Sequence, residues 1–312
     1  MRRSMASFSR VSVFLLCILV HCSGVLSATF TLTNNCPYTI WPGILANAGT
    51  SPLSTTGFEL DQGASTTLTA PSTWSGRFWA RSHCTTDSNG KFTCVTGDCG
   101  SGTLECSGGG AAPPATLAEF TLGNGALDFY DVSLVDGFNL PMLVTPQGGS
   151  GNCTATGCLV DLNGLCPSML RVASAGDSVV ACKSACEAFG DPQYCCSGSY
   201  GNPNTCKPTP YSQFFKNACP RAYSYAYDDG TSTFTCTSAD YTITFCPSIP
   251  SQKSARPQDP EAAGLPLINN TMIFSGVPDS DTTSGAPPRW GRGLGLPLLV
   301  AAAVSLLVLL LL

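Results

Sequence analysis

Cysteine is the residue type whose number and spacing give this chain most of its potential chemistry. The 312 residues include 18 cysteines, which form disulfides in an oxidising compartment or bind zinc as thiolates in a reducing one. Zinc is the competing interpretation because Cys182 and Cys186, and the adjacent pair Cys195 and Cys196, lie at short spacings. The choice between the two depends on whether the chain is exported.

The N-terminal residues favour export because they have the order typical of a secretory signal peptide. Three arginines, at positions 2, 3 and 10, precede the largely apolar residues 11–20. This run is too short to span a bilayer, which needs about 20 apolar residues, and its basic flank favours a signal over a buried core helix. Val25 and Ser27 suit the −3 and −1 positions of a cleavage site. We therefore expect residues 1–27 to be removed and the mature chain to start at Ala28.

Export favours disulfides over zinc. Cleavage would remove Cys17 and Cys22 and leave 16 cysteines, an even number that suits complete pairing in a secreted chain. Structural zinc sites belong mainly to reducing compartments. We expect a disulfide-stapled domain that holds neither a metal nor a cofactor.

The C-terminal residues predict a second processing event. Residues 296–312 contain no charged residue and are preceded by small residues and a short polar spacer. This order is typical of a glycosylphosphatidylinositol (GPI) attachment signal, whose apolar tail is removed. We expect attachment at Ser284, with Ser275 and Ser280 as alternatives, and loss of residues 285–312. A single-pass helix is the competing interpretation, because roughly 20 apolar residues could just span a bilayer.

Loss of both segments would leave an acidic chain. Five arginines would be removed, so that 10 Lys and Arg remain beside 20 Asp and Glu. Nucleic acid is disfavoured as a ligand, because its phosphates are neutralised by clusters of Lys and Arg. The expected ligands are neutral or cationic. His83 would be the single histidine of the mature sequence, and its place beside Cys84 in a loop predicts a surface residue.

Composition divides the mature chain into a folded domain, residues 28–247, and a flexible stalk, residues 248–284. The stalk is rich in Pro, Ser, Asp and Thr and poor in aromatic residues, so it cannot bury enough apolar surface to fold alone. Asn269 and Asn152 each begin an Asn-X-Thr pattern that accepts N-glycosylation. Asn269 carries more weight, since the middle residue of the other pattern is a cysteine.

The pattern of the folded domain predicts a mainly β structure. Its strand-like runs are rich in Thr, Phe, Tyr and Val and are bounded by Gly, Pro or Asn. Four such runs lie at residues 29–33, 76–80, 127–132 and 241–245. Residues 174–189 are the best helix candidate, with Asp177 near the start and Gly190 just past the end. All-β domains reach this length, so one domain is expected.

The most specific motif is the sequence GKFTCVTGDC at residues 90–99, followed by Gly102 and Cys106. It resembles the thaumatin family signature position by position. The resemblance continues over the whole folded domain and includes all 16 mature cysteines, the number found in full-length members such as thaumatin and osmotin. The further matching segments are ATF at 28–30, NCPYT at 35–39, GRFWAR at 76–81, TLAEF at 116–120, GFN at 137–139, YCC at 194–196 and FCP at 245–247.

Disulfide connectivity cannot be derived from spacing, because even eight cysteines allow 105 pairings. The family resemblance implies it instead. The implied pairs are Cys36–Cys246, Cys84–Cys94, Cys99–Cys106, Cys153–Cys236, Cys158–Cys219, Cys166–Cys182, Cys186–Cys195 and Cys196–Cys206. The first pair would tie together the two ends of the domain.

The resemblance also implies an architecture with three parts. These are a flattened β-sandwich, a helix-bearing lobe around residues 161–219 and a small loop lobe around residues 83–113. Between the sandwich and the helix-bearing lobe, members similar to osmotin have a cleft lined by one arginine and four acids. Carried over to this sequence, they are Arg77, Glu119, Asp131, Asp136 and Asp228. Asp229 adjoins the last of these, and the sequence leaves open which of the two faces the cleft.

A cluster of carboxylates suits a sugar, because ionised carboxylates accept hydrogen bonds from hydroxyls and aromatic rings pack on pyranose faces. Aromatic residues close in sequence to the cluster are Phe129, Tyr130, Phe138, Tyr225 and Tyr227. The structural alternative is that Arg77 only neutralises its neighbours and Asp136 caps a turn. Clustering like charges costs stability unless a ligand or partner offsets it, which favours a binding site.

The same acids could hydrolyse a glycosidic bond. Glycosidases use two carboxyl groups, one of which keeps a raised pKa so that it can donate a proton. Glu119 is the candidate acid, and Asp131 or Asp136 is the candidate nucleophile or base. Some members of the family are credited with weak endo-β-1,3-glucanase activity and others lack it, so we place binding ahead of hydrolysis.

Three functions therefore remain in view. The first is a plant defence-type protein, held by its GPI anchor at the outer face of the plasma membrane in the apoplast, which binds fungal β-1,3-glucan or the fungal surface as a monomer. The second is a weak endo-β-1,3-glucanase. The third is a non-defensive module of the cell wall or plasmodesmata. The fungal target, the tissue and its induction, and the length of the glucan are not readable from the sequence.

Overall fold

The computed structural model describes residues 27–248. Several expectations lie outside these residues: removal of the signal peptide, the stalk, glycosylation at Asn269 and GPI attachment at Ser284, Ser275 or Ser280. Between residues 27 and 248, no helix has the length and apolar character needed to cross a bilayer.

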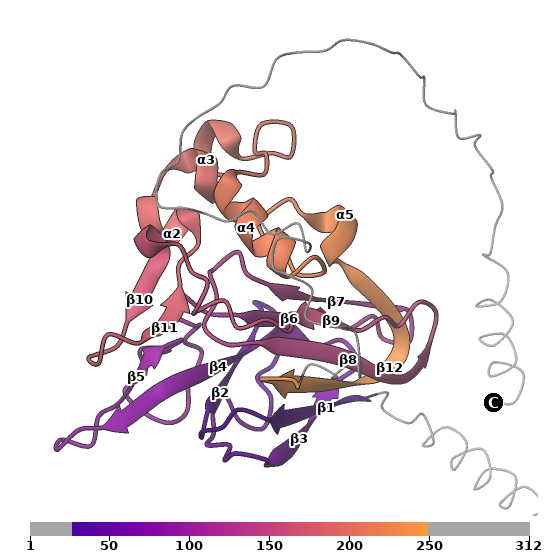
Figure 1. The fold of residues 1–312 in the computed structure, drawn as a ribbon. Helices are drawn as coiled ribbons and strands as arrows, with labels where there is room; N and C mark the ends of the chain where they lie inside the picture. The colour runs from indigo at the N-terminus through magenta and orange to yellow at the C-terminus, as the bar shows by residue number, and fades with distance from the viewer. Residues whose placement is uncertain (1–26, 249–312) are drawn as a thin grey trace, which may run out of the picture. The chain divides into compact units, whose positions relative to one another are not determined.

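Most of the described chain forms a curled β-sheet (Figure 1). Seven strands are hydrogen-bonded in the order β2-β4-β6-β7-β12-β1-β3, with β5 on β4 and with β8 joining β12 to β9. The strands are β1 (Ser27–Asn34), β2 (Trp41–Ala46), β3 (Ser65–Pro71), β4 (Ser75–Thr86), β5 (Phe92–Thr96), β6 (Leu117–Thr121), β7 (Leu127–Ser133), β8 (Met142–Ser150), β9 (Thr156–Cys158) and β12 (Phe234–Phe245). The four strand-like runs of the sequence lie inside β1, β4, β7 and β12, which confirms the mainly β prediction.

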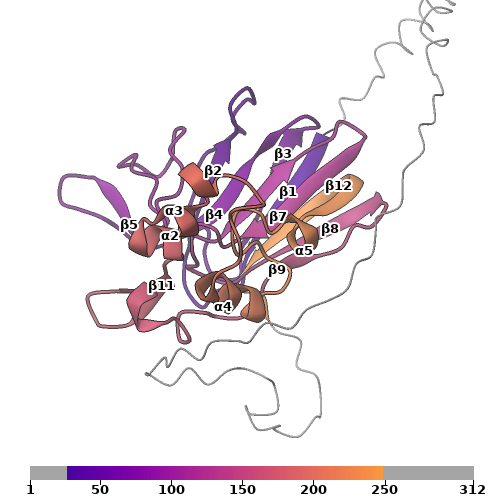
Figure 2. The same cartoon turned by 90° about the horizontal axis from the view of Figure 1, so that it is seen from above.

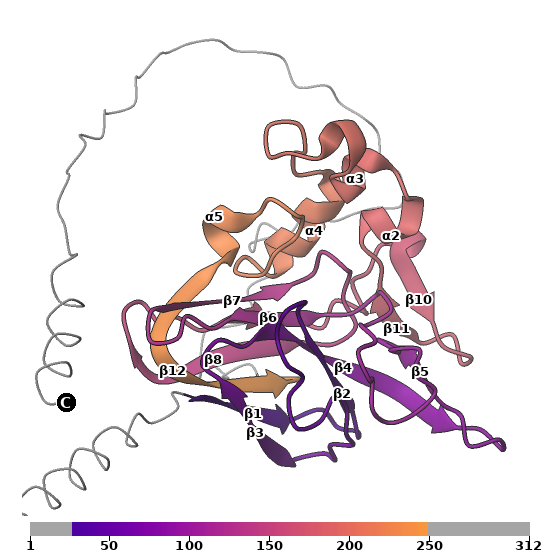
Figure 3. The same ribbon diagram turned by 180° about the vertical axis from the view of Figure 1, so that it is seen from behind.

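The sheet curls because the long strand β12 changes partners along its length. Its first residues pair with β7, and residues from Tyr241 onward pair with β1 on one side and β8 on the other. Buried residues alternate with more exposed ones along most of this strand, as expected where one face covers a core. The strand therefore connects the layer that holds β6 and β7 to the layer that holds β1 and β3 (Figure 3).

An aromatic core fills the space inside the curl. Phe30 of β1 lies at its centre, with ring centroids 4.8 Å from Phe78 and from Phe120 and 5.7 Å from Tyr241. All four side chains are at most 2% exposed. Burial of such large side chains stabilises the fold by roughly 1.5–3 kcal/mol each. Because the four rings come from β1, β4, β6 and β12, this packing holds the two layers of the flattened sandwich together.

The helix-bearing lobe covers one side of the sheet next to β6 and β7 (Figures 1 and 2). Its regular elements are the 3-10 helices η1 (Ser168–Leu170) and η2 (Gly198–Tyr200), the hairpin of β10 (Arg171–Ala173) and β11 (Val179–Cys182), and the helices α2 (Ala185–Phe189), α3 (Pro192–Cys195), α4 (Pro210–Ala218) and α5 (Asp229–Ser232). Thr209 caps the longest of these helices, α4, through a reciprocal capping box with Ser212.

The predicted helix over residues 174–189 is only partly correct. Its last five residues form α2, which Gly190 ends in the left-handed conformation with φ of 66°. The first part forms a turn and strand β11 instead, which pairs with β10 and ends at Cys182. Asp177, predicted near the helix start, lies in the turn of this hairpin with φ of 58°. The adjacent β-branched residues Val179 and Val180 favour the extended backbone.

Eight disulfides connect the described residues, and their pairs are those that the family resemblance implies. Cys36–Cys246 joins residues 210 positions apart and so closes the ends of the domain. Four of the bridges, those of Cys166, Cys186, Cys196 and Cys158, fix the helix-bearing lobe. The cysteines at short spacings that suggested zinc are thus used as disulfides.

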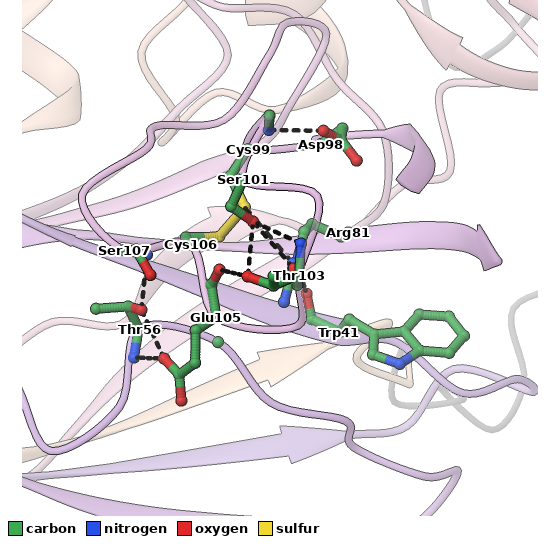
Figure 4. Close-up of a disulfide and its surroundings, with 12 residues drawn as sticks. Trp41, Thr56, Arg81, Asp98, Cys99, Ser101, Thr103, Glu105, Cys106 and Ser107 are labelled. Carbon is green, nitrogen blue, oxygen red and sulfur yellow. Dashed lines mark hydrogen bonds between the residues drawn. A yellow bond between two sulfur atoms is a disulfide. The ribbon is translucent and has the colours of Figure 1, made fainter. Parts of the chain in front are cut away.

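The loop lobe is attached to the sheet through Arg81 of β4, which is fully buried (Figure 4). Its guanidinium donates hydrogen bonds to the carbonyl oxygens of Trp41 (3.0 Å), Pro42 (3.3 Å) and Leu104 (2.7 Å). Glu105, in the same loop, accepts bonds of 2.6 Å from both the backbone N–H and the hydroxyl of Thr56. Arg81 and Glu105 therefore both have hydrogen-bond partners within the protein.

Candidate functional site

Three of the five predicted site residues lie side by side across neighbouring strands. Arg77 of β4 is the register partner of Glu119 on β6, and Glu119 is the register partner of Asp131 on β7. Directly opposed residues in antiparallel strands have Cβ atoms about 4.5–5.5 Å apart and point to the same face. The fold thus brings residues 54 positions apart in sequence into one row on the outer face of the sheet.

The row contains an ion pair that leaves polar atoms unpaired. Arg77 Nε lies 3.4 Å from Glu119 Oε1, and each side chain is 34% exposed. The geometry does not make a hydrogen bond, so the buried Nε atom has no hydrogen-bond partner. Burial raises the pKa of Glu119; the Arg77 charge opposes this rise and Asp136 adds to it.

Asp131 is the most perturbed carboxyl group of the row. Burial raises its pKa to about 8, the Glu119 charge adds to the rise, Arg77 opposes it and Asp229 adds a further contribution. Its Oδ2 atom is buried without a hydrogen-bond partner. At neutral pH this carboxyl group therefore keeps its proton for most of the time and can donate as well as accept a hydrogen bond.

Asp136 lies beyond the end of β7, in a turn fixed by Gly137. Burial raises the pKa of Asp136 and the Arg77 charge opposes the rise, which places this acid next to the row. Gly137 has φ of +86°, and a Cβ atom there would lie 2.6 Å from the carbonyl oxygen of Cys182. Only glycine suits such a position, so the turn is held against the segment that leads into α2.

The structure distinguishes the two neighbouring acids at the start of α5, Asp228 and Asp229. The Asp228 carboxylate lies 2.9 Å from Lys216 Nζ and accepts bonds of 3.0 Å from the N–H and hydroxyl of Ser224. Asp229 is exposed, accepts a 2.8 Å bond from the Tyr223 hydroxyl and raises the pKa of Asp131. Asp228 is thus used within the helix-bearing lobe, and we replace it by Asp229 in the candidate site.

We call Arg77, Glu119, Asp131, Asp136 and Asp229 the acidic site. The rings expected beside it divide into two groups, because Tyr130 and Phe138 are buried in the core while Phe129 is 47% exposed two residues before Asp131. Phe129 therefore lies on the same face of β7 as Asp131. It is the ring of that strand that can touch a ligand.

The structure has two hollows that do not include the acidic site. A small one, of about 20 Å³, lies under the helix-bearing lobe between Val135, Ala185 and Tyr225, and holds about one water molecule. A larger one, of about 370 Å³, lies at the far end of the sheet beside Ala28, Gln147 and Asp240. The acidic site lines neither. Across residues 27–248, no group of His, Cys, Asp and Glu side chains has the arrangement of a metal site.

Comparison with known proteins now decides the family. The thaumatin family model matches residues 34–247. The chain belongs to the thaumatin family. It is 60% identical over 245 residues to "Thaumatin-like protein 1" of Arabidopsis thaliana, a match that covers 76% of this chain and 93% of the relative.

Two further relatives extend the thaumatin-family comparison. "Pathogenesis-related protein 5" of Arabidopsis thaliana is 58% identical over 244 residues, or 78% of this chain and all of the relative. "Glucan endo-1,3-beta-glucosidase" of Prunus avium is 58% identical over 226 residues, or 72% of this chain and 92% of the relative. The chain is a thaumatin-like protein of the pathogenesis-related, defence type. Its eight disulfides agree with secretion.

Sequence reasoning missed one residue that completes this thaumatin-family site. The Tyr223 hydroxyl, which donates to Asp229, also lies at hydrogen-bonding distance from the hydroxyl of Thr233. Burial raises the pKa of Tyr223, so it remains a hydrogen-bond donor at any pH at which the protein works. Tyr223 lies three residues after the pair Cys219-Pro220, and this sequence context does not indicate such a role.

The glycosylation acceptor Asn152 lies within the described residues. Its side chain is exposed, and the Thr154 hydroxyl donates a 3.1 Å bond to Asn152 Oδ1. The middle residue, Cys153, is bridged to Cys236. Modification of Asn152 remains a prediction.

Proposed function

We propose that this protein is a cell-surface defence protein that binds β-1,3-glucan of fungal walls through the acidic site. One observation carries the proposal: Arg77 Nε and Asp131 Oδ2 are buried polar atoms of a single row and have no hydrogen-bond partner among residues 27–248. Leaving such atoms unpaired costs about 1–3 kcal/mol each. A ligand that accepts a hydrogen bond from Arg77 Nε and forms one with Asp131 Oδ2 would recover this free energy.

A neutral sugar suits these groups better than an anion. Each sugar hydroxyl both donates and accepts, so it can accept from Arg77 and from the protonated Asp131 and donate to Glu119. The exposed ring of Phe129 can pack on a pyranose face beside them. The relative named for glucan endo-1,3-β-glucosidase activity, 58% identical to this chain, supports a β-1,3-linked glucan as the sugar.

The proposal includes the place where the protein acts. We propose that it is a monomer held by a GPI anchor on Ser284 at the outer face of the plasma membrane, in the apoplast. Phosphatidylinositol-specific phospholipase C should then release it from intact cells. Persistent attachment, with the C-terminal leucines detectable by mass spectrometry, would favour a spanning helix instead.

Binding is tested with laminarin, a soluble β-1,3-glucan, and the purified secreted protein. Asp131→Asn should weaken binding by roughly 0.5–1.5 kcal/mol, the range for a hydrogen bond between neutral groups, and Asp136→Asn should weaken it by about 1–3 kcal/mol. Asp177→Asn is a matched control, since it removes one charge from an exposed turn away from the acidic site. Full binding by the Asp131→Asn, Asp136→Asn double variant, with its fold confirmed by circular dichroism, would remove the acidic site from the mechanism.

Hydrolysis is a second candidate function because of the raised pKa of Asp131. A carboxyl group with a pKa of about 8 can serve as general acid at neutral pH, and Glu119, paired with Arg77, can serve as the ionised nucleophile. This assignment reverses the roles expected from the sequence. Glu119 and Asp131 are register partners on neighbouring strands, so the two carboxyl groups start from adjacent positions on one face of the sheet, as an acid and a nucleophile on one glycosidic bond require.

The two candidates differ in a direct measurement. If hydrolysis occurs, Glu119→Gln and Asp131→Asn should each abolish laminarin turnover, and NMR should show a first-formed sugar with the β configuration retained. Binding without turnover selects the binding protein. If the protein neither binds nor hydrolyses laminarin, the non-defensive wall or plasmodesmal module becomes the favoured function.

A further inference from the structure

One buried acid near the acidic site belongs to the helix-bearing lobe. Glu187 lies in α2, its side chain is 22% exposed, and its Oε2 atom is buried without a hydrogen-bond partner. In the described part of the chain its one ionic partner is Lys183, four residues earlier, at a distance of 3.8 Å between Nζ and Oε1. This distance is too long for a hydrogen bond. Glu187 therefore resembles Asp131, because each has a buried carboxyl oxygen without a hydrogen-bond partner among the described residues.

The backbone places Glu187 opposite Asp136. Phe138 and Cys182 exchange two backbone hydrogen bonds, of 2.8 and 2.7 Å, so the segment after Asp136 is paired with the segment before α2. Gly137 lies against Ser184, the residue whose side chain accepts a bond from Glu187 N and caps the helix. The first turn of α2 is thereby fixed next to the turn that holds Asp136.

The pKa shifts of the carboxyl groups agree with this proximity. Burial raises the pKa of Glu187, Lys183 opposes the rise and the Asp136 charge adds to it. Asp136 in turn raises the pKa of Glu119, and Glu119 and Asp229 raise that of Asp131. The carboxyl groups thus form one continuous series from α2, across the sheet, to α5. Figure 1 shows α2 and α5 at opposite ends of the helix-bearing lobe, with β6 and β7 beneath.

We infer that Glu187 is a ligand-binding residue of the acidic site, so that a glucan chain is held from the sheet and from the helix-bearing lobe together. The inference rests on the proposed function and adds to it the contribution of α2. Lys183 lies too far from the Glu187 carboxylate to donate a hydrogen bond to it, and the side chain is 22% exposed, so a sugar hydroxyl can donate to this group instead. A chain that reaches from Asp131 past Asp136 to Glu187 would contact more than one sugar unit, so Glu187 should matter for long oligosaccharides and little for short ones.

The test compares Glu187→Gln with Asp177→Asn, which removes the same charge from the same lobe outside the series. Without ligand, carboxyl ¹³C NMR titration should show that Asp136→Asn lowers the pKa of Glu187 and that Asp177→Asn does not. With ligand, Glu187→Gln should weaken laminarin binding about tenfold, as expected for one hydrogen bond to a charged group, and should leave binding of the disaccharide unchanged. Asp177→Asn should bind both ligands as the unaltered protein does.

The outcomes separate this inference from the proposed function. If Asp131→Asn weakens laminarin binding and Glu187→Gln does not, the inference is overturned and the proposed function stands. An equal loss for disaccharide and laminarin would also overturn it, because Glu187 would then act on the fold or on a single sugar position. Failure of the unaltered protein to bind laminarin would overturn the proposed function and the inference together.

Discussion

Two arginines of strand β4, four residues apart, lie in opposite electrostatic situations. Arg81 is fully buried, and its guanidinium donates to three backbone carbonyl groups. Arg77 is partly exposed, and its buried Nε atom has no hydrogen-bond partner. Both side chains project from the same face of the strand. The difference indicates which charge the fold uses for its own stability and which it leaves available to a ligand.

The acids near the two arginines also differ in whether they have hydrogen-bond partners. Glu105, close to Arg81, accepts hydrogen bonds from Thr55 and Thr56, and these bonds lower its pKa despite its partial burial. Asp131, close to Arg77, has a pKa raised to about 8 and an unpaired buried oxygen. Perturbed and unpaired groups cluster at functional sites more often than elsewhere. The comparison therefore favours a structural role for the loop lobe and supports the proposal that the acidic site binds a ligand.

The largest expected effect is on stability, at Arg81. Arg81→Met would leave carbonyl groups such as that of Leu104 without their donor in the interior, so we expect a loss of roughly 3–5 kcal/mol in the free energy of unfolding. Arg77→Met should cost less than about 1 kcal/mol, because its ion pair is partly exposed. Denaturant unfolding with the disulfides intact measures both. Equal losses would remove the distinction between the two arginines.

The sequence predicted the division into lobes far better than it predicted this distinction. The strand runs, the disulfide pairs and the glycine that ends α2 all depend on local residue types or on a family signature, and the structure contains them. Whether Asp228 or Asp229 joins the site depends on Lys216, which lies on α4 and forms an ion pair with Asp228. Such a choice is made by tertiary contacts, which a linear pattern does not show.

The raised pKa of Asp131 gives the next effect, a pH dependence of stability. The folded protein keeps this proton up to about pH 8, whereas the unfolded chain loses it near the ordinary value of 3.8. The folded state therefore binds more protons at Asp131 between these values, so the contribution of Asp131 to stability is complete below about pH 4 and is lost as the pH rises to about 8. The slope for one proton is about 1.4 kcal/mol per pH unit.

Asp131→Asn isolates this contribution, since the asparagine carries no titrating proton. Unfolding free energies measured from pH 4 to pH 8 should fall less steeply for the variant than for the unaltered protein, and the two curves should separate toward neutral pH. Asp177→Asn should reproduce the unaltered slope. If the Asp131→Asn curve has that slope as well, Asp131 titrates normally and cannot serve as a proton donor at neutral pH.

The smallest expected effects come from the adjacent acids Asp228 and Asp229. They too differ in whether the fold uses the charge for its own contacts. Asp228→Asn would weaken contacts with Lys216 and Ser224 and should cost about 1–2 kcal/mol of stability, because the Lys216 ammonium would lose its carboxylate partner. Asp229→Asn, at an exposed position, should change stability by less than about 0.5 kcal/mol. It should nevertheless lower the pKa of Asp131, because it removes a nearby negative charge. Carboxyl ¹³C NMR titration of Asp131 in the two variants makes the measurement. A drop in the Asp131 pKa with Asp228→Asn but not with Asp229→Asn would return Asp228 to the acidic site and remove Asp229 from it.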